Sequence, residues 1–275
     1  MENGISNHGD RVRQRACFFD IDGTLWDRQN RIPESAVRAI RALRRNGHKA
    51  LLCSGRSRSY IFDEALLAIG FDGIVSGAGA MLELNGETLF SRVFAPEKVL
   101  TAVQTAEEFG YTPLLEGVRT ISIRAEGFPI PDYYDKLKRE LGDVLEPLSR
   151  RWGRWDDTSK LTVLGLPGAR PMDELRQALS GAFDFLVHGP ALAELVLPNV
   201  NKGTGLRAAC EAMRLDVRDS VAFGDSANDA QMLEAAGVGV CMGNGTDALK
   251  RLADLVTAPM EQDGVLVALE RLGLI

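Results

Sequence analysis

The chain has 275 residues, of which 45% are hydrophobic, and a formal net charge of −6. This length can bury one large core or two smaller ones, and the negative charge excludes a general attraction to nucleic acid or to an anionic membrane. No apolar run approaches the roughly 18 residues of a membrane-spanning helix. Residues 1–15 are polar, lack the apolar core of a signal peptide and predict a disordered tail. We therefore expect a cytoplasmic protein that is a monomer or a weak homodimer.

The cysteine pattern agrees with a reducing compartment. The four cysteines lie within or beside apolar segments and form no Cys-x-x-Cys pair. We expect buried, reduced thiols and neither a disulfide framework nor a cysteine metal site. They are Cys17, Cys53, Cys210 and Cys241.

The first predicted strand ends in two acidic residues. The apolar run from Ala16 to Phe19 leads directly into Asp20-Ile21-Asp22-Gly23-Thr24. Side chains two residues apart in a strand point to the same side, so Asp20 and Asp22 are expected in one small site. Burial of two like charges is unfavourable unless a cation or a reaction uses them. The alternative is a strand end at which two solvated acids cap a turn.

A second strand ends in a turn that suits an anion. Pro33 and Gly47 bracket a predicted helix, and the strand Leu51–Cys53 follows it. Ser54-Gly55-Arg56 then supplies a hydroxyl and a flexible turn, which can offer hydrogen-bond donors to an anion. Ser54 alone can equally serve as a helix N-cap.

The alternation of strands and helices changes in the middle of the chain. A second helix is expected from about Ser59 to Ile69, then a strand over residues 73–76 and a hairpin over residues 81–90 with an Asn-Gly turn. From Pro96 to about Pro190, helices are separated by strand pairs. We therefore predict a core domain of residues 1–80 and 190–275, and an inserted α+β cap domain of residues 81–189.

A basic patch lies within the insertion. The segment from Arg150 to Trp155 interleaves three arginines with two tryptophans. It can contact an anionic or sugar substrate, although a solvated hairpin is the simpler interpretation.

Two further motifs follow the insertion. Lys202-Gly203 opens a predicted helix, where an ammonium is unfavourable unless an anion is held there. The apolar strand Val221–Phe223 ends in Gly224-Asp225-Ser226-Ala227-Asn228-Asp229, which supplies two carboxylates and an amide. Each motif has an ordinary interpretation as a cap or a surface charge. Together with the first two motifs they make a four-part site for phosphate and a divalent metal.

Both ends of the chain alternate strands with helices, which predicts a doubly wound α/β domain with a parallel, Rossmann-like sheet. Ligands of such sheets bind beyond the carboxyl ends of the strands, where all four motifs fall. The sequence has no phosphate-binding loop of the P-loop type and no dinucleotide fingerprint after a strand, so a nucleotide cofactor is not indicated.

The four motifs resemble those of the haloacid dehalogenase-like superfamily, and specifically its Cof-type phosphatases with a type IIB cap. The matching segments are Asp20–Thr24, Ser54–Arg56, Lys202-Gly203 and Gly224–Leu233, with further agreement at Met242–Gly245 and Asp263–Val265. The chain departs from the family where Ser76-Gly77-Ala78 replaces a frequent Asn-Gly-Ala triplet.

The resemblance implies a Mg²⁺-dependent phosphatase that hydrolyses a small phosphorylated metabolite, a sugar phosphate or similar phosphomonoester, through an aspartyl-phosphate. Asp20 would be the nucleophile and Asp22 the general acid and base, while Ser54 and Lys202 would hold the transferring phosphoryl group. Mg²⁺ would be held by Asp20, Asp22 and Asp225, with Asp229 behind them. The remaining expected phosphate-binding residues are Gly23, Thr24, Gly55, Arg56 and Asn228.

Two alternatives stay open at this point. A phosphomutase of the same architecture would use the same aspartate but return the phosphoryl group to its substrate. A phospho-accepting regulatory or binding protein would need an acceptor carboxylate and metal-binding acids but no general acid, so the intact Asp20-x-Asp22 pair argues against it.

Overall fold

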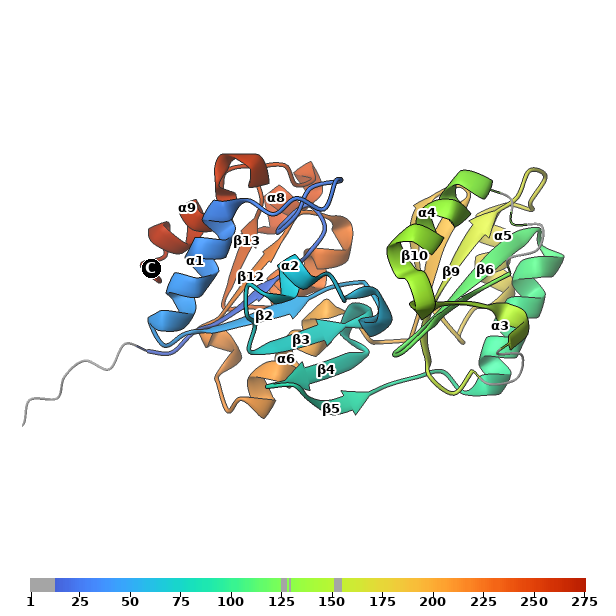
Figure 1. Ribbon diagram of the computed structural model, residues 1–275, viewed down its shortest axis with the longest axis horizontal. Coiled ribbons are helices and arrows are strands. Elements are labelled where there is room, and N and C mark those ends of the chain that lie inside the picture. Colours follow the sequence, from blue (N-terminus) through green and yellow to red (C-terminus); the bar gives the residue numbers. More distant parts are fainter. Residues whose placement is uncertain (1–12, 125–127, 129, 151–154) are drawn as a thin grey trace, which may run out of the picture.

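The computed structural model describes residues 13–124, 128, 130–150 and 155–275. Two sheets with their helices form two lobes, joined through the chain on either side of the insertion (Figure 1). The α/β class, the parallel core and the inserted α+β cap are confirmed.

The core sheet has eight strands in the order β14-β13-β12-β1-β2-β3-β4-β5. Its central strand β1 (Ala16–Phe19) pairs in parallel with β2 (Lys49–Cys53) on one side and with β12 (Ser220–Gly224) on the other. The three strands that bear motifs therefore end at the same edge. The other parallel strands are β3 (Gly73–Ser76), β13 (Val238–Cys241) and β14 (Leu255–Val256), and β4 (Met81–Leu84) and β5 (Glu87–Ser91) form an antiparallel hairpin.

Helices cover both faces of the core sheet because alternate residues of its strands are apolar on both sides. Phe19 and Leu52 pack in one hydrophobic cluster with α1 (Glu34–Arg45) and α9 (Gly264–Arg271). Phe18 and Leu51, one residue earlier in each strand, pack in another cluster with α6 (Lys202–Ala212) and α7 (Ala230–Ala235). Strands buried on both faces are typical of a parallel sheet. The short helix α8 (Asp247–Leu252) adds Leu249 to the second cluster.

The cap has a six-stranded sheet in the order β10-β11-β9-β6-β7-β8. Helices α3 (Pro96–Glu108) and α5 (Met172–Ala178) share one core with one face of this sheet, and α4 (Pro131–Leu141) packs with Leu114, Ile123 and Leu164 on the other. The strands are β6 (Tyr111–Gly117), β7 (Ile121–Ile123), β8 (Leu145–Pro147), β9 (Thr158–Gly165), β10 (Asp184–Gly189) and β11 (Leu192–Val196).

The strand pairing differs from the predicted domain boundaries at both ends. The β4–β5 hairpin extends the core sheet through β3, whereas β11 pairs with β9 and β10 in the cap sheet. The sequence could not show this, because a hairpin carries no signal for the sheet it joins. We therefore propose boundaries near residues 92 and 197 in place of 81 and 189.

The predicted helix from Ser59 to Ile69 was wrong in its extent. A 3-10 turn over Arg58–Tyr60 is separated from α2 (Glu64–Leu67) by residues with extended backbone. Asp63 accepts a hydrogen bond from the backbone N–H of Leu66 and so starts α2. The N-cap residue Asp63 therefore separates two helical segments that the apolar spacing predicted as one helix.

The structure also bears on the expectations for the N-terminal tail, the basic patch, the cysteines and membrane-spanning helices. Arg13 forms an ion pair with Asp219 at 2.7 Å, so the last part of the predicted tail contacts the core, and residues 1–12 lie outside the described residues. In the basic patch, residues 151–154 also lie outside them, and Trp155 is buried in the cap core. All four cysteines are buried and free. None of the helices in the described residues has the length and apolar character that crossing a bilayer requires.

The first turn of α6 packs closely against β3 and the loop after it at Gly205. A Cβ atom there would lie 2.5 Å from Val75 Cγ1 and 2.9 Å from the Cα of Gly79. We expect Gly205→Ala to lower the free energy of unfolding by about 1–3 kcal/mol through overpacking, although helix propensity alone favours alanine by about 1 kcal/mol. Urea unfolding measures this change.

Gly189→Ala is the matched control, because a Cβ atom at Gly189 meets nothing within 4 Å. It should change stability by less than about 0.5 kcal/mol. Equal stability of Gly205→Ala and the wild type would contradict the close contact between α6 and β3.

Candidate active site

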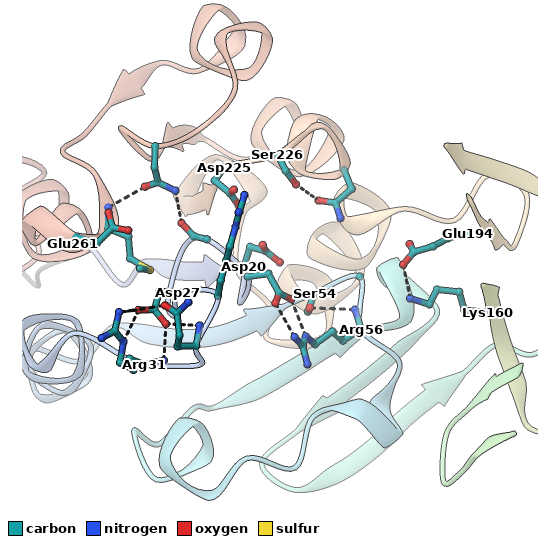
Figure 2. Close-up of a pocket in the computed structure, with 18 residues that line it drawn as sticks. Asp20, Asp27, Arg31, Ser54, Arg56, Lys160, Glu194, Asp225, Ser226 and Glu261 are labelled. Carbon is teal, nitrogen blue, oxygen red and sulfur yellow. Dashed lines mark hydrogen bonds and ion pairs between the residues drawn. The ribbon is translucent and has the colours of Figure 1, made fainter. Parts of the chain in front are cut away.

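Three of the four predicted motifs line one cavity of about 640 Å³ at the carboxyl ends of β1, β2 and β12 (Figure 2). This volume is within the range of about 300–1,000 Å³ that small-molecule sites occupy. Two cap residues, Lys160 and Glu194, complete its lining, so the cavity lies between the two lobes. The predicted site residues that line it are Asp20, Asp22, Gly23, Ser54, Gly55, Arg56, Asp225 and Asn228.

A buried ammonium joins three of the motifs. Lys202 Nζ donates to Asp20 Oδ1 at 2.6 Å, to Asp229 Oδ1 at 2.6 Å and to Asn228 Oδ1 at 3.1 Å. Burial by itself would lower the pKa of Lys202, but the charges of Asp20 and Asp229 raise it above its usual value. The lysine is therefore a permanent cation at the centre of the site.

Local hydrogen bonds hold Lys202 and its partner Asp229 in position. Asn201 caps α6 by accepting from the backbone N–H of Thr204 at 3.0 Å, which sets Lys202 at the first helical position. Asp229 Oδ2 accepts from the backbone N–H groups of Asp225 and Ser226 at 2.9 and 3.0 Å. Both oxygens of Asp229 are thus engaged in holding the loop and the lysine.

The charges at this edge of the sheet leave room for a divalent cation. Asp20, Asp225 and Asp229 each offer an oxygen within 4.8 Å of the others, and Lys202 contacts two of them, Asp20 and Asp229. When all three carboxylates are ionised, they exceed the charge of Lys202 by two, which equals the charge of one divalent ion. Burial, then the charge of Asp229, raise the pKa of Asp225 to about 7, and Asp225 Oδ1 has no hydrogen-bond partner among the described residues. Carboxylate oxygens are the ligands that Mg²⁺ prefers, so the residues fit this ion.

Asp22 is held apart from this cluster by Arg56. The guanidinium donates to both Asp22 oxygens at 2.8 and 2.7 Å, and Trp26 Nε1 donates at 3.1 Å. Arg56 lies 4.8 Å from the ring centre of Trp26 and 5.0 Å from that of Tyr60. Burial alone would raise the pKa of Asp22, but the hydrogen bonds and charge of Arg56 lower it. The aromatic pair holds the cation in place by cation–π contact.

Some of the expected glycine and hydroxyl residues line the cavity, and others are buried behind it. Gly23 has φ +78°, and a Cβ atom there would lie 2.4 Å from Asp225 Oδ2, so glycine allows the two loops to approach. Ser54 is buried and accepts from the backbone N–H of Arg56 at 3.1 Å. Thr24, Lys202 and Asp229 are buried and do not line the cavity, unlike the other expected residues.

Asn244 has a positioning role that the sequence did not predict, although its motif was recognised. Its amide donates to the Gly23 carbonyl at 2.8 Å and its oxygen accepts from the backbone N–H of Met260 at 2.9 Å. It therefore fixes the turn after Asp22. Four more residues were missed because only the fold brings them to the site. Lys160 and Glu194 line the cavity, and Trp26 and Tyr60 contact Arg56.

Known proteins of similar sequence cover almost the whole chain. The model of the haloacid dehalogenase-like hydrolases matches residues 17–269. YkrA of Bacillus subtilis, which is named as a phosphatase, is 31% identical over 271 residues, covering 95% of this chain and 98% of that protein. A phosphoglycolate phosphatase of Methanothermobacter thermautotrophicus is 28% identical over 258 residues, covering 94% of this chain and 98% of that protein.

Solved structures show the same two-lobed architecture. A sugar phosphatase of subclass IIB of the superfamily has a TM-score of 0.81 at 25% identity, and the match covers 95% of this chain and 100% of that one. A protein from Geobacillus kaustophilus has a TM-score of 0.81 at 26% identity, with the same coverage.

The raised pKa of Asp225 predicts how a divalent cation changes stability with pH. Without the cation, Asp225 binds more protons in the folded protein than in the unfolded chain between pH 3.8 and about 7, so the contribution of this residue to stability falls as pH rises through that window. A bound cation would offset the loss of stability that follows from ionisation of Asp225. We therefore expect Mg²⁺ to raise the melting temperature more at pH 8 than at pH 5, by several degrees in a thermal unfolding scan.

Asp225→Asn is the control, because an amide keeps the shape and removes the charge. This variant should show a weaker Mg²⁺ effect at pH 8. An equal Mg²⁺ effect in the variant and the wild type would contradict a cation site at Asp225.

Proposed function

The chain belongs to the haloacid dehalogenase-like hydrolase family, as its motifs predicted, and we propose that it is a Mg²⁺-dependent phosphatase of a small phosphorylated metabolite, a sugar phosphate or similar phosphomonoester. The observation that supports this most strongly is the contact of Lys202 with Asp20. Asp20 in turn lies beside Asp225 and lines the same cavity as Asp22. The phosphatase names of the relatives favour hydrolysis over a phosphomutase or a regulatory protein.

Asp20 is the proposed nucleophile. One of its oxygens forms a bond to phosphorus while the bond from phosphorus to the leaving oxygen breaks, which yields an aspartyl-phosphate. Burial raises the pKa of Asp20 above its usual value, while the charge and hydrogen bond of Lys202 oppose this shift and hold Asp20 in position. Ser54 and Gly55 line the cavity beside Asp20, and there they can donate to the phosphoryl oxygens.

Asp22 is the proposed general acid and base. It gives a proton to the leaving alkoxide in the first step and takes a proton from water in the second, as that water attacks phosphorus and releases Asp20. The Arg56 ion pair keeps Asp22 ionised. The acid role therefore requires Arg56 to transfer its hydrogen bonds from Asp22 to the phosphoryl oxygens when substrate binds.

The residues that would hold Mg²⁺ are Asp20 and Asp225, with the backbone carbonyl of Asp22. Asp229 would stand behind them, since both of its oxygens are already engaged. When bound, the ion neutralises charge on the phosphoryl group and the carboxylates during transfer.

Substitution of the two aspartates tests the roles. Asp20→Asn should abolish turnover and leave no phosphorylated enzyme, because a carboxamide is a poor nucleophile. Asp22→Asn should slow turnover by about 100- to 10,000-fold, and the loss should shrink for a substrate with a good leaving group. Rapid mixing with an aryl phosphate measures both the rate and the phosphoenzyme. An equal loss with every leaving group, or a phosphorylated Asp20→Asn protein, would contradict these roles.

Removal of the metal tests the cofactor. Chelation should abolish release of inorganic phosphate, and added Mg²⁺ should restore it, because the carboxylates would otherwise repel the substrate. Asp225→Ala should reproduce the loss, with circular dichroism as the check that the chain stays folded. Full activity after exhaustive removal of metal would exclude the assignment.

A further inference from the structure

We propose that the cap surface facing the active site selects a neutral, hydroxyl-rich leaving group and rejects a substrate with a second anionic group, through the ion-pair cluster of Glu116, Lys160 and Glu194. The inference rests on the proposed function, because it concerns the part of a phosphomonoester that lies beyond the phosphate. No motif drew attention to these residues.

The cluster lies on one face of the cap sheet. Glu116 of β6 is directly opposite Lys160 of β9, and Glu194 of β11 is opposite Thr162 of β9. Helix α4 packs on Leu114 and Leu164 of this same face, so it covers only one part of it. Lys160 and Glu194 line the active-site cavity (Figure 2), and all three residues of the cluster line a second cavity.

The charges of the cluster are buried and paired with one another. Lys160 is 4% exposed, and its Nζ lies 2.8 Å from Glu194 Oε1 and 3.2 Å from Glu116 Oε2. Thr162 Oγ1 donates to Glu116 Oε1 at 2.6 Å, and His188 Nε2 lies 3.6 Å from Glu194 Oε2. With His188 neutral, one lysine between two glutamates leaves one negative charge in excess, and the hydrogen bond with Glu194 raises the pKa of His188 above its usual value. Buried ion pairs add little stability compared with apolar packing, so a role in binding explains the cluster better.

A second cavity, of about 320 Å³, extends from the active site along this face. It shares Asp22, Arg56, Lys160 and Glu194 with the first cavity, so a leaving group attached to a phosphate at Asp20 can reach it. Its remaining polar lining includes Tyr60, Tyr133, Lys136 and Glu140 on the side of α4 and the core loop.

Every cation that lines the second cavity, among the residues that the structure describes, already has a carboxylate partner in the same lining. Arg56 pairs with Asp22 at 2.7 Å, and Lys136 pairs with Glu140 at 3.6 Å. Lys160 has two such partners. Arg28 lines the first cavity but not the second, so it is not among these cations. A carboxylate or second phosphate on the leaving group would therefore lose its hydration and meet an excess of negative charge.

Hydroxyl groups suit the same surface. Carboxylate oxygens accept more than one hydrogen bond, and an ammonium has three donors, so the cluster can accept from some hydroxyls and donate to others. The tyrosine hydroxyls in the lining can do both. A polyol that replaces water here keeps its hydrogen bonds, whereas a second anion does not.

Matched substrate pairs test the proposal on the wild-type protein with Mg²⁺. Glycerol 3-phosphate and 3-phosphoglycerate differ by one carboxylate, and fructose 6-phosphate and fructose 1,6-bisphosphate differ by one phosphate. We expect kcat/KM for the member without the extra anion to be higher by at least about tenfold in each pair. Equal values, or a preference for the more anionic member, would overturn the proposal. This comparison does not depend on whether any variant folds.

Two variants of the same type locate the effect. Glu194→Gln removes the excess charge and should reduce the discrimination by about tenfold, mainly by improving KM for the anionic member. Glu174→Gln is the control, since Glu174 is an exposed residue of α5 that lines neither cavity. Unchanged discrimination in folded Glu194→Gln would overturn the role of the cluster.

An aryl phosphate separates this inference from the proposed function. If the wild type hydrolyses the aryl phosphate but does not discriminate within the pairs, the inference fails alone. If it hydrolyses no phosphomonoester at all with Mg²⁺, the proposed function fails and the inference fails with it.

Discussion

The site depends on one buried ammonium shared by three segments of the chain. Lys202 is 1% exposed and lies within 2.6 Å of oxygens from both Asp20 and Asp229. Asp20, directly after β1, and Asp229, in the 3-10 turn after β12, would repel each other, and the lysine from α6 makes their approach favourable. It does not compensate the third carboxylate, Asp225. The same interaction that assembles the site therefore also leaves the charge that a divalent cation satisfies.

Close backbone contacts allow this arrangement. Gly79 has φ +98°, and a Cβ atom there would lie 2.2 Å from the Asn201 carbonyl, so the loop after β3 can lie directly against the start of α6. Gly23 allows the same closeness between the turn after β1 and Asp225. In both places a larger residue would move a charged side chain of the site, which ties the backbone geometry to the electrostatics.

The sequence predicted the core site well because its residues follow strands. Asp20, Ser54 and Asp225 each come directly after an apolar strand, and the carboxyl ends of parallel strands meet at one edge. The cap site had no such signal. Glu116, Lys160 and Glu194 lie on three strands whose pairing is antiparallel and non-sequential, and each alone is an ordinary polar residue of a half-buried sheet. The predicted domain boundary at residue 81 falls between β3 and β4, which pair with each other in the core sheet, so the change in the alternation of strands and helices did not locate this boundary.

Under the proposed function, the two lobes divide the recognition of a substrate by charge. In the core, a divalent cation and Lys202 would together balance the charges of Asp20, Asp225 and Asp229, so a phosphate dianion needs a further positive charge. Arg56 lines the same cavity, but Asp22 already neutralises it. Protonation of Asp22 releases that charge to the phosphate, and the same proton is the one that the leaving alkoxide needs. On the cap side of the second cavity, each cation among the described residues already has a carboxylate partner, and Lys160 has two. Protonation of Asp22 therefore frees one cation for the substrate phosphate, whereas the described lining of the cap offers no unpaired cation to a second anion.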